Sequence, residues 1–425
     1  MENRPKLYAI TAFVAGILLT LGYKDLYPDL EWRFWRRRRA NRTIAGAGLH
    51  DNGLINLEDH EKEGAVTMEV PEGIEACIGN TPLFKIKSLS AETGCDILAK
   101  AEFLNGGGGS PKDRVALSII NLAEEQGLLT PYSGDTIYEG TVGSTGISLA
   151  TVCRARGYLA YICMPSDQAT EKSSLLLKLG AVVERVPPAP IVDPMHFVNR
   201  ARTLAAEHTA DSHRLGRGYF ADQFENEANW QAHYDGTGSE VFRQCGGNLD
   251  AFVAGAGTGG TITGVARYLK TRLPDVKIVL ADPQGSGLYN RIKYGVMFAT
   301  TEKEGTRRRS QVDTIVEGIG INRVTANFEA GRELIDDAVK VDDEQALAMA
   351  RWLVEKDGIF VGSSSAVNCI AAVKTAQKLG PGHRIVTILC DSGARYISKF
   401  WAKAGSVGGK TDSTLDDIIV TQNQN

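Results

Sequence analysis

Short apolar runs alternate with amphipathic stretches along most of the chain, and this pattern decides the expected fold. The apolar runs are short and nearly continuous, which is typical of strands buried on both faces; they lie at 96–102, 136–140, 159–165, 182–187, 251–257, 276–283 and 384–391. Helices are expected between them, at 111–127, 145–156, 170–179, 194–208, 261–272, 343–356 and 365–379. The alternation predicts an α/β fold with doubly wound parallel sheets, in which ligands bind at the carboxyl ends of the strands.

The N-terminus has a different pattern. Residues 7–23 carry no charge and as a helix would span about 26 Å, marginally short of a bilayer core. Aromatic residues follow at 32–35 and four arginines at 36–39, a combination typical of a membrane interface with its basic side in the cytosol. No A-x-A cleavage site follows closely, and the run is apolar on all sides, which disfavours a secretory signal and an amphipathic transit segment. We therefore predict an N-terminal transmembrane helix.

The domain organisation follows from these patterns. We expect a transmembrane anchor at 7–23, a basic flank and tether at 24–70, a catalytic domain at 71–405 and a flexible tail at 406–425. The short anchor with its basic flank favours the mitochondrial outer membrane, with the catalytic domain facing the cytosol. The endoplasmic reticulum membrane is the alternative.

Composition excludes some functions. The net charge of -4 gives no general reason to expect nucleic-acid binding. Seven cysteines form no CxxC pair and no Cys/His cluster at zinc spacing, which indicates reduced thiols and predicts no metal site.

One glycine-rich loop leads into a lysine. In the segment 106–114, Ser110 can cap the following helix, Pro111 suits its first turn, and Lys112 then stands in that turn. The positive end of the helix dipole should lower the pKa of the Lys112 ammonium group. Lys112 is therefore a candidate Schiff-base amine, although a solvated lysine at a helix start is the simpler interpretation.

Three further loops lie between a strand and a helix. Residues 255–261 could hold a phosphate at a helix N-terminus, yet the spacing of Gly255, Gly257 and Gly260, with Asp282 further on, also fits a dinucleotide-binding fingerprint. The loop 141–146 offers backbone N–H groups and hydroxyls that suit a carboxylate. Three serines at 363–365 precede a helix and could be caps only.

Taken together, these segments resemble the cysteine synthase and cystathionine β-synthase family, pyridoxal-phosphate enzymes of fold type II, over residues 74–400. Residues 78–83 are similar to the family's opening motif, residues 110–114 match its S-x-K-D-R motif, and residues 257–264 are similar to its phosphate loop. The resemblance implies two doubly wound α/β lobes with pyridoxal 5′-phosphate between them, and a homodimer. It implies that Lys112 is catalytic and carries the cofactor, and that Ser364 meets the pyridine nitrogen. It assigns the phosphate to Gly257, Thr258, Gly259, Gly260 and Thr261.

The substrate loop departs from the family pattern. The family reads T-S-G-N-T-G where this chain has the segment 141–146, so Ser144 replaces the asparagine that bonds the cofactor's 3′-oxygen, and Val142 replaces the serine that holds the substrate carboxylate. The resemblance assigns Ser144 to the cofactor. Substrate binding then falls to Thr141, Gly143, Thr145 and Gln223.

The implied activity is β-replacement, which forms L-cysteine from O-acetyl-L-serine and sulfide. The altered substrate loop leaves β-elimination open, as in a cysteine desulfhydrase or a serine or threonine dehydratase. A catalytically weak, membrane-tethered scaffold and a nicotinamide dehydrogenase also remain open.

Overall fold

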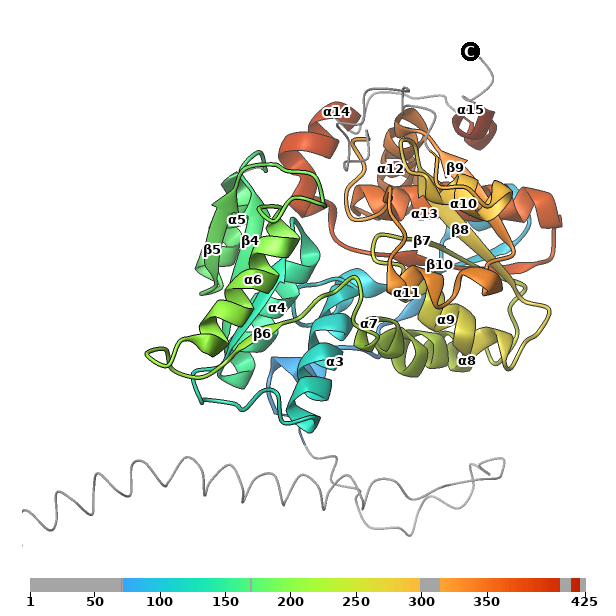
Figure 1. Cartoon of the computed structure of the whole chain (residues 1–425). Coiled ribbons are helices and arrows are strands. Elements are labelled where there is room, and N and C mark those ends of the chain that lie inside the picture. The colour runs from blue at the N-terminus through green and yellow to red at the C-terminus, as the bar shows by residue number, and fades with distance from the viewer. Residues whose placement is uncertain (1–69, 71, 169, 299–313, 406–413, 421–425) are drawn as a thin grey trace, which may run out of the picture. The chain divides into compact units, whose positions relative to one another are not determined.

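Two sheets with their covering helices make up the part of the chain that begins at Pro71 (Figure 1). The computed structural model describes residues 70, 72–168, 170–298, 314–405 and 414–420. One sheet has six strands in the order β1-β2-β10-β7-β8-β9, and the other has four in the order β5-β4-β3-β6. The strands are β1 (Leu83–Lys85), β2 (Asp96–Ala101), β3 (Thr136–Gly140), β4 (Leu159–Pro165), β5 (Val182–Val186), β6 (Gly218–Phe220), β7 (Ala251–Gly255), β8 (Lys277–Pro283), β9 (Asp337–Val341) and β10 (Arg384–Leu389).

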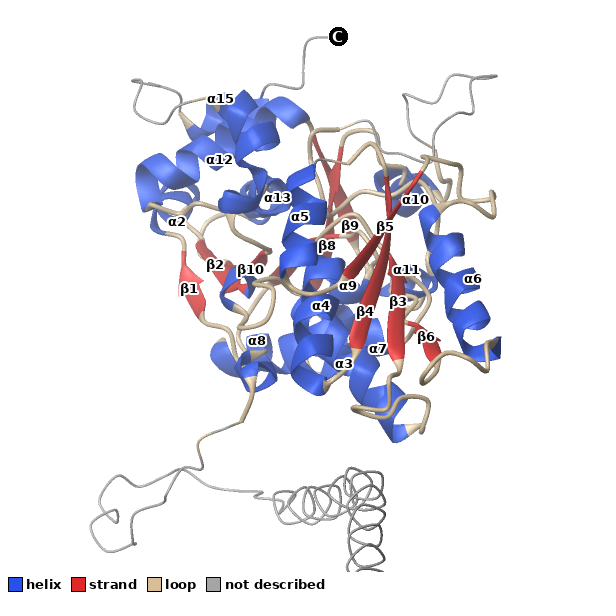
Figure 2. Cartoon of the chain, turned by 90° about the vertical axis from the view of Figure 1, so that its left-hand side faces the viewer, coloured by secondary structure: helices blue, strands red, loops and turns tan. Residues whose placement is uncertain are grey.

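The helices connect these strands and cover both sheets (Figure 2). Those of the first half of the chain are α2 (Lys87–Thr93), α3 (Lys112–Glu125), α4 (Ser144–Arg156), α5 (Thr170–Lys178), α6 (Phe197–Ala210), α7 (Ala228–Ala232) and α8 (Ser239–Gln244). Those of the second half are α9 (Gly260–Lys270), α10 (Leu288–Tyr294), α11 (Ala326–Glu329), α12 (Asp343–Asp357), α13 (Ser363–Leu379), α14 (Ala402–Ala404) and α15 (Leu415–Val420).

Parallel pairing dominates both sheets. Only β1 runs antiparallel to its neighbour among the paired strands, with Phe84 opposite Ala99. The last strand, β10, lies in the middle of the larger sheet, where Ile385 pairs with Ile97 of β2 on one side and with Ala251 of β7 on the other. The carboxyl ends of β2, β7 and β10 therefore meet at one edge, as in other doubly wound sheets.

Each sheet has an apolar layer on both faces. On the larger sheet, α13 and α12 pack over one face with buried residues such as Ile370 and Leu353, and α9 covers the other with Val265. On the smaller sheet, α3 and α4 form a layer with β3 and β4, and α6 covers the opposite face with Ala201. Burial on both faces explains why the strands are continuous apolar runs instead of alternating ones.

The strands predicted from continuous apolar runs are all present, within a few residues at their ends. Three strands were missed, namely β1, β6 and β9. Two of these contain only three residues, and β9 mixes buried and half-buried positions at the edge of the larger sheet. Such strands have no continuous apolar signal to detect.

The predicted fold class is wrong in one part, the N-terminal transmembrane helix. No helix within the described residues is long and apolar enough to cross a membrane. The longest of them, α13, has 17 residues, whereas a span needs about 20 apolar residues. The segments predicted as anchor, 7–23, and as basic flank and tether, 24–70, fall almost wholly outside the described residues. The fold class is therefore corrected to the α/β fold, in which no described helix spans a membrane.

The C-terminal segment differs from the expected flexible tail where the structure describes it. Residues 415–420 form α15, whose Leu415 and Ile418 are buried in the core cluster beneath α12. The side chain of Gln345 donates a hydrogen bond to the carbonyl of Ile419. This short helix therefore packs on the domain, while residues 406–413 and 421–425 lie outside the described part.

Candidate functional site

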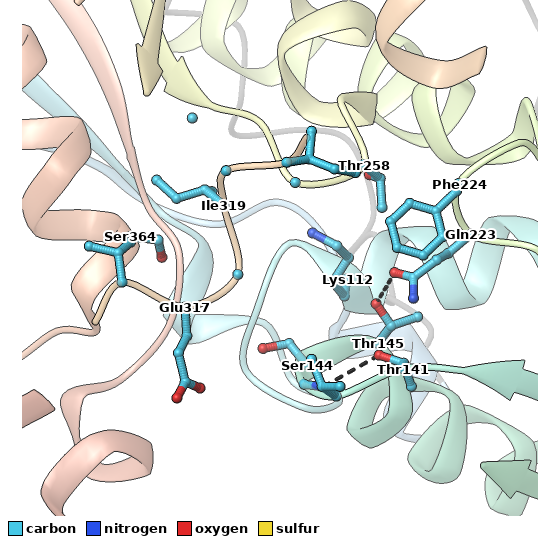
Figure 3. Close-up of a pocket in the computed structure, with 18 of the residues that line it drawn as sticks. Lys112, Thr141, Ser144, Thr145, Gln223, Phe224, Thr258, Glu317, Ile319 and Ser364 are labelled. Atoms are coloured by element: carbon cyan, nitrogen blue, oxygen red, sulfur yellow. Dashed lines mark hydrogen bonds between the residues drawn. The ribbon is translucent and has the colours of Figure 1, made fainter. Parts of the chain in front are cut away.

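Four helices begin around one pocket (Figure 3). They are α3, α4, α9 and α13, each with at least 11 residues. Their N-termini carry unpaired N–H groups and the positive ends of helix dipoles, so the pocket favours anions. The residues predicted for the site line this pocket with one exception, Gly260; those that line it are Lys112, Thr141, Gly143, Ser144, Thr145, Gln223, Gly257, Thr258, Gly259, Thr261 and Ser364.

Lys112 is the first residue of α3 and points into the middle of the pocket. Burial lowers the pKa of the Lys112 ammonium group, and the nearby carboxyl group of Asp391 opposes that shift. The lowered pKa was predicted, but from the helix dipole, whereas withdrawal from water is the larger cause in the structure. A lysine with a lowered pKa provides a neutral amine more readily at physiological pH, as a nucleophile or base requires.

The glycine loop before Lys112 wraps around a carboxylate. Asp113 accepts hydrogen bonds from the N–H groups of Gly108 at 2.7 Å and Gly109 at 2.8 Å, and from the hydroxyl of Ser148 at 2.5 Å. A Cβ atom at Gly108 would come within 3.0 Å of the Asp113 carboxylate. The glycines therefore allow the loop to close tightly over Asp113, which fixes the start of α3 and with it Lys112.

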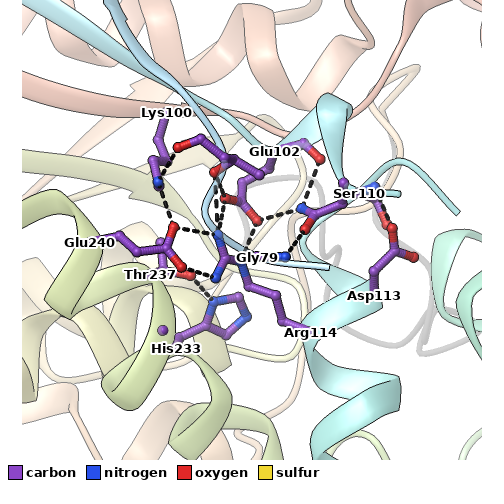
Figure 4. Close-up of polar contacts among 12 residues, drawn as sticks. Gly79, Lys100, Glu102, Ser110, Asp113, Arg114, His233, Thr237 and Glu240 are labelled. Carbon is purple, nitrogen blue, oxygen red and sulfur yellow. Dashed lines mark hydrogen bonds and ion pairs between the residues drawn. The ribbon is translucent and has the colours of Figure 1, made fainter. Parts of the chain in front are cut away.

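A buried charge network holds α3 from the other side (Figure 4). Arg114 forms paired hydrogen bonds with Glu102, at 2.8 and 2.9 Å, and with Glu240, at 2.7 and 2.8 Å. Lys100 pairs with Glu240 at 2.6 Å, so two cations face two carboxylates. Burial alone would raise the pKa of Glu240, but Arg114 outweighs it and lowers that pKa to about 2. Both carboxylates therefore stay ionised at neutral pH, and the network joins α3 to β2 and α8.

The loop before α9 depends on glycine for close backbone packing. A Cβ atom at Gly257 would lie 2.3 Å from the carbonyl oxygen of Gly318, and one at Gly259 would lie 2.5 Å from Cα of Phe328. Gly259 also has φ of +88°, which residues with a side chain rarely adopt. Gly260 does not line the pocket because its Cα packs against the side chain of Asn229.

The hydroxyl groups of this loop are held from behind. The amide of Asn229 donates to Oγ1 of Thr258 at 2.9 Å. His233, in the helical turn η3 (His233–Gly238), lies between two hydroxyls, with Thr261 at 3.2 Å from Nε2 and Thr237 at 2.9 Å from Nδ1. Burial lowers the pKa of His233 to about 3, so the imidazole is neutral at physiological pH. A neutral ring can donate to one hydroxyl and accept from the other.

The three serines at the start of α13 have different surroundings. Ser363 and Ser365 accept hydrogen bonds from the backbone N–H groups of Glu317, at 3.0 Å, and Cys390, at 2.8 Å. Ser364, between them, is buried and lines the pocket. Helical geometry thus presents Ser364 to the pocket and uses its neighbours to fix the adjoining loops.

Ser144, the first residue of α4, contacts the C-terminal part of the chain. Its hydroxyl donates to Oδ2 of Asp391 at 3.3 Å and accepts from Nη1 of Arg395 at 3.2 Å. Tyr396 donates to the same carboxylate oxygen at 2.6 Å. Burial raises the pKa of Asp391, which is 3% exposed. These contacts join the helix of the smaller sheet to the segment that follows β10.

Hydrogen bonds of threonine hydroxyl groups hold the rest of the substrate loop in place. Thr141 accepts from the N–H of Gly143 at 3.4 Å, and Thr145 donates to the side-chain oxygen of Gln223 at 2.5 Å (Figure 3). Gln223 in turn donates from Nε2 to Glu139 at 3.1 Å. Val142 lines the pocket beside them without a polar group. The loop can therefore present hydroxyls and the N-terminus of α4 to a carboxylate.

Two lysines meet one carboxylate at another part of the pocket wall. Glu317 pairs with Lys172 of α5 at 2.6 Å and with Lys399, after β10, at 3.0 Å. All three residues line the pocket. The pairs link α5, beside the smaller sheet, to the loop between α10 and α11 and to the segment after β10.

The competing dinucleotide interpretation required a free Asp282 at the end of β8. Asp282 is fully buried and accepts a hydrogen bond from the N–H of Tyr289 at 2.7 Å. Burial raises the pKa of Asp282 to about 6. The carboxylate is thus used to hold the turn into α10, and it does not line the pocket.

Comparison with known proteins decides between the remaining classes. A model of the family described as pyridoxal-phosphate dependent enzyme matches residues 74–391. The chain belongs to this family. Within it, the predicted resemblance to the cysteine synthases and cystathionine β-synthases of fold type II is confirmed by relatives at high identity.

The relatives cover nearly the whole chain. Cysteine synthase 2 of Emericella nidulans is 67% identical over 431 residues, which cover 99% of each chain. A protein of Saccharomyces cerevisiae named putative mitochondrial cysteine synthase is 54% identical and covers 83% of this chain and 90% of its own. Among solved structures, the O-acetylserine-dependent cystathionine β-synthase of Helicobacter pylori aligns with a TM-score of 0.66 and 34% identity, covering 78% of this chain and 99% of its own.

The pocket fits the family's cofactor, pyridoxal phosphate. The N-terminus of α9 offers a backbone site for a phosphate in which glycines leave no room for side chains. The amine of Lys112 lies in the same pocket, as does Ser364. The donor set thus combines an anion site, a reactive amine and a neutral hydroxyl.

Four polar residues that support this site were missed from the sequence, namely Asp113, Glu139, His233 and Asp391. Asp113 follows Lys112 directly in the matched S-x-K-D-R motif and could have been examined for that reason. The others act on site residues from distant parts of the chain: His233 on Thr261, Glu139 on Gln223 and Asp391 on Ser144. Nothing in the sequence near these three residues indicates such contacts.

Proposed function

We propose that the chain is a cysteine synthase, which forms L-cysteine from O-acetyl-L-serine and sulfide by β-replacement with pyridoxal 5′-phosphate. One observation carries the proposal: the amine of Lys112 lies in a pocket where four helix N-termini meet. Such a pocket suits a cofactor phosphate and a substrate carboxylate at the same time. The names of the relatives, at 67% and 54% identity, support the same activity.

The cofactor residues in this proposal are those of two helix starts and the lysine. Gly257, Thr258, Gly259, Gly260 and Thr261 hold the phosphate through the N-terminus of α9. Lys112 would bind the cofactor covalently, Ser364 would be the partner of its pyridine nitrogen, and Ser144 would be the partner of its 3′-oxygen. When bound, the cofactor supplies the electron sink for loss and replacement of a group at the substrate's β-carbon.

Lys112 and the substrate loop carry out the remaining steps. Thr141, Gly143, Thr145 and Gln223 orient the substrate carboxylate at the N-terminus of α4. The Nζ atom of Lys112 takes the α-proton, because burial lowers its pKa and favours the neutral amine. A neutral serine beside the pyridine nitrogen weakens the electron sink relative to a carboxylate, which favours chemistry at the β-carbon over transamination.

We further propose a homodimer and a mitochondrial location. The dimer rests on the family resemblance, and the location rests on the name of the Saccharomyces cerevisiae relative. Light scattering of the purified chain and fractionation of cells test these two points. A monomer, or absence from the mitochondrial fraction, contradicts the respective proposal.

The Lys112→Ala variant tests the proposed function directly. The purified wild-type chain should show the visible absorbance band of the cofactor, and the variant should lose it. The rate of cysteine formation should fall by about 10²–10⁴-fold, the usual effect of losing a positioned proton acceptor. Lys403→Ala, which removes an exposed lysine after β10, is the matched control and should leave both unchanged.

A product assay separates replacement from elimination. With O-acetylserine and sulfide the wild type should release cysteine, whereas pyruvate without cysteine would show an eliminating enzyme and contradict the proposal. A wild type without an absorbance band would contradict the cofactor assignment.

A further inference from the structure

Behind the substrate loop, Glu139 begins a chain of side chains that ends in the pocket. Glu139 lies near the end of β3 and is fully buried. Its Oε1 atom accepts from Nε2 of Gln223 at 3.1 Å, and its Oε2 atom accepts from the backbone N–H of Gln223 at 3.3 Å. The Oε1 atom of Gln223 then accepts from the hydroxyl of Thr145 at 2.5 Å. Gln223 and Thr145 line the pocket, whereas Glu139 does not.

The groups that face Glu139 give it no countercharge. Asp222, in the turn after β6, carries a like charge, and Cys163 of the neighbouring strand β4 is neutral. Asp222 itself forms an ion pair with Arg202 at 3.4 Å. Burial is the main cause that raises the pKa of Glu139, to about 8, and the hydrogen bonds from Gln223 oppose it.

The protonation state of Glu139 decides the orientation of the Gln223 amide. The backbone N–H of Gln223 occupies Oε2, so a proton on the carboxyl group must sit on Oε1. An Oε1–H group acts as a donor toward the Gln223 side chain, which favours a turned amide that presents its oxygen to Glu139 and gives up the 3.5 Å contact from Nε2 to the carbonyl of Gly140. The amide nitrogen then faces Thr145, whose oxygen accepts, and the Thr145 hydroxyl hydrogen becomes free.

We propose that Glu139 is a positioning residue that sets, through Gln223, whether Thr145 donates its hydroxyl hydrogen to the substrate carboxylate. With Glu139 ionised, Thr145 donates to Gln223, as in this structure, and offers the pocket only lone pairs. With Glu139 neutral, the same hydroxyl donates into the pocket. The inference rests on the proposed function, because it assumes that the loop 141–145 receives a carboxylate.

The consequence is a pH dependence of carboxylate affinity. If only the form with neutral Glu139 binds well, the dissociation constant of a carboxylate ligand rises by about tenfold between about pH 7 and pH 9, as one proton with a pKa near 8 requires. Affinity is therefore present below that pKa and lost above it.

Alanine and alaninamide are the probes, each titrated into the holoenzyme and followed by the shift of the cofactor's absorbance band. Both carry an amine, but only alanine has a carboxylate. Each dissociation constant is compared between wild type and variant at the same pH, so that titration of the ligand's own amine cancels. Relative to the Glu139→Gln variant, the wild type should lose affinity for alanine above about pH 8. Its affinity for alaninamide should show no such loss.

The decisive variant is Glu139→Gln. Its amide donates to Oε1 of Gln223 and so holds the arrangement of neutral Glu139 at every pH. We expect tight alanine binding without the tenfold rise. Asp222→Asn is the matched control, because removal of the like charge lowers the pKa of Glu139 and should move the midpoint to lower pH without abolishing the rise.

Two results would overturn the inference. One is an unchanged rise in Glu139→Gln, and the other is an equal rise for alaninamide in the wild type. If Glu139→Gln does not fold, Gln223→Met breaks the same chain and should also remove the rise. A wild type without a cofactor band would instead refute the proposed function, whereas a band with pH-independent alanine affinity would refute this inference alone.

Discussion

The loops before α9 and α4 both bring a helix N-terminus to the pocket, but they are built in opposite ways. The loop before α9 is defined by its backbone, because Cβ atoms at Gly257 and Gly259 would collide with other main-chain atoms. The loop before α4 is defined by hydroxyl side chains, and a Cβ atom at Gly143 would meet nothing within 4 Å. One loop thus tolerates no added atom, while the other has open space.

The difference matches the two ligands that we assign to these loops. A phosphate is the same in every enzyme that uses the cofactor, so a rigid backbone site serves all of them. A substrate differs from enzyme to enzyme, and side chains can change without moving the backbone. The departures at Val142 and Ser144 are accordingly in the loop that has room for change.

The largest effect is expected for Gly259→Ala. Its φ of +88° disfavours any side chain, and the new methyl group would lie 2.5 Å from Cα of Phe328. Strain of about 1–3 kcal/mol from the backbone conformation alone corresponds to about 5- to 150-fold in cofactor affinity. Fluorescence titration of the apoenzyme with pyridoxal phosphate measures it, and an unchanged affinity would show that the loop is not the rigid phosphate site.

A smaller effect is expected for Ser144→Ala, which tests the side-chain-built loop. The variant removes the hydrogen bonds to Asp391 and from Arg395, at 3.3 and 3.2 Å. Loss of one such pair typically lowers the free energy of unfolding by about 0.5–1.5 kcal/mol. Chemical denaturation measures the loss. Asp391→Asn should lower the free energy of unfolding further, because Tyr396 also donates to this carboxylate, and the effects of the two changes should not add in the double variant, because both disturb the contact between Ser144 and Asp391.

The smallest effect is expected for Gly143→Ala. No atom lies within 4 Å of the new Cβ, so the free energy of unfolding should change by less than about 0.5 kcal/mol. Cofactor affinity should stay within about twofold of the wild type. A loss of cofactor affinity as large as that of Gly259→Ala would remove the contrast between the two loops.

Much of the fold could be predicted because its main strands are buried on both faces. Ile97 of β2, Ile278 of β8 and Ile385 of β10 lie in such runs and are fully buried. The short strands β1 and β6 owe their existence to pairing with distant segments, which no local pattern reveals. The membrane helix was inferred from an uncharged segment and its aromatic and basic flank, and no described helix is long and apolar enough to span a membrane.

The site was predictable where a single loop contains it, and less so where distant residues meet. Lys112 and the glycines of residues 257–260 stand in contiguous motifs, and the structure brings all but Gly260 to the pocket wall. Asp391 reaches Ser144 across 247 residues, and Glu240 reaches Arg114 across 126. Those contacts depend on the sheet order, which local patterns do not specify.

The central place of β10 has a consequence for synthesis of the protein. Because β10 pairs with both β2 and β7, the larger sheet cannot close until residues 384–389 have left the ribosome. Until then β2 and β7 expose unpaired strand edges, which are prone to join other chains. The smaller sheet, complete by residue 220, has no such delay. We therefore expect folding of the larger sheet to be slow, later than that of the smaller sheet and dependent on protection of those edges.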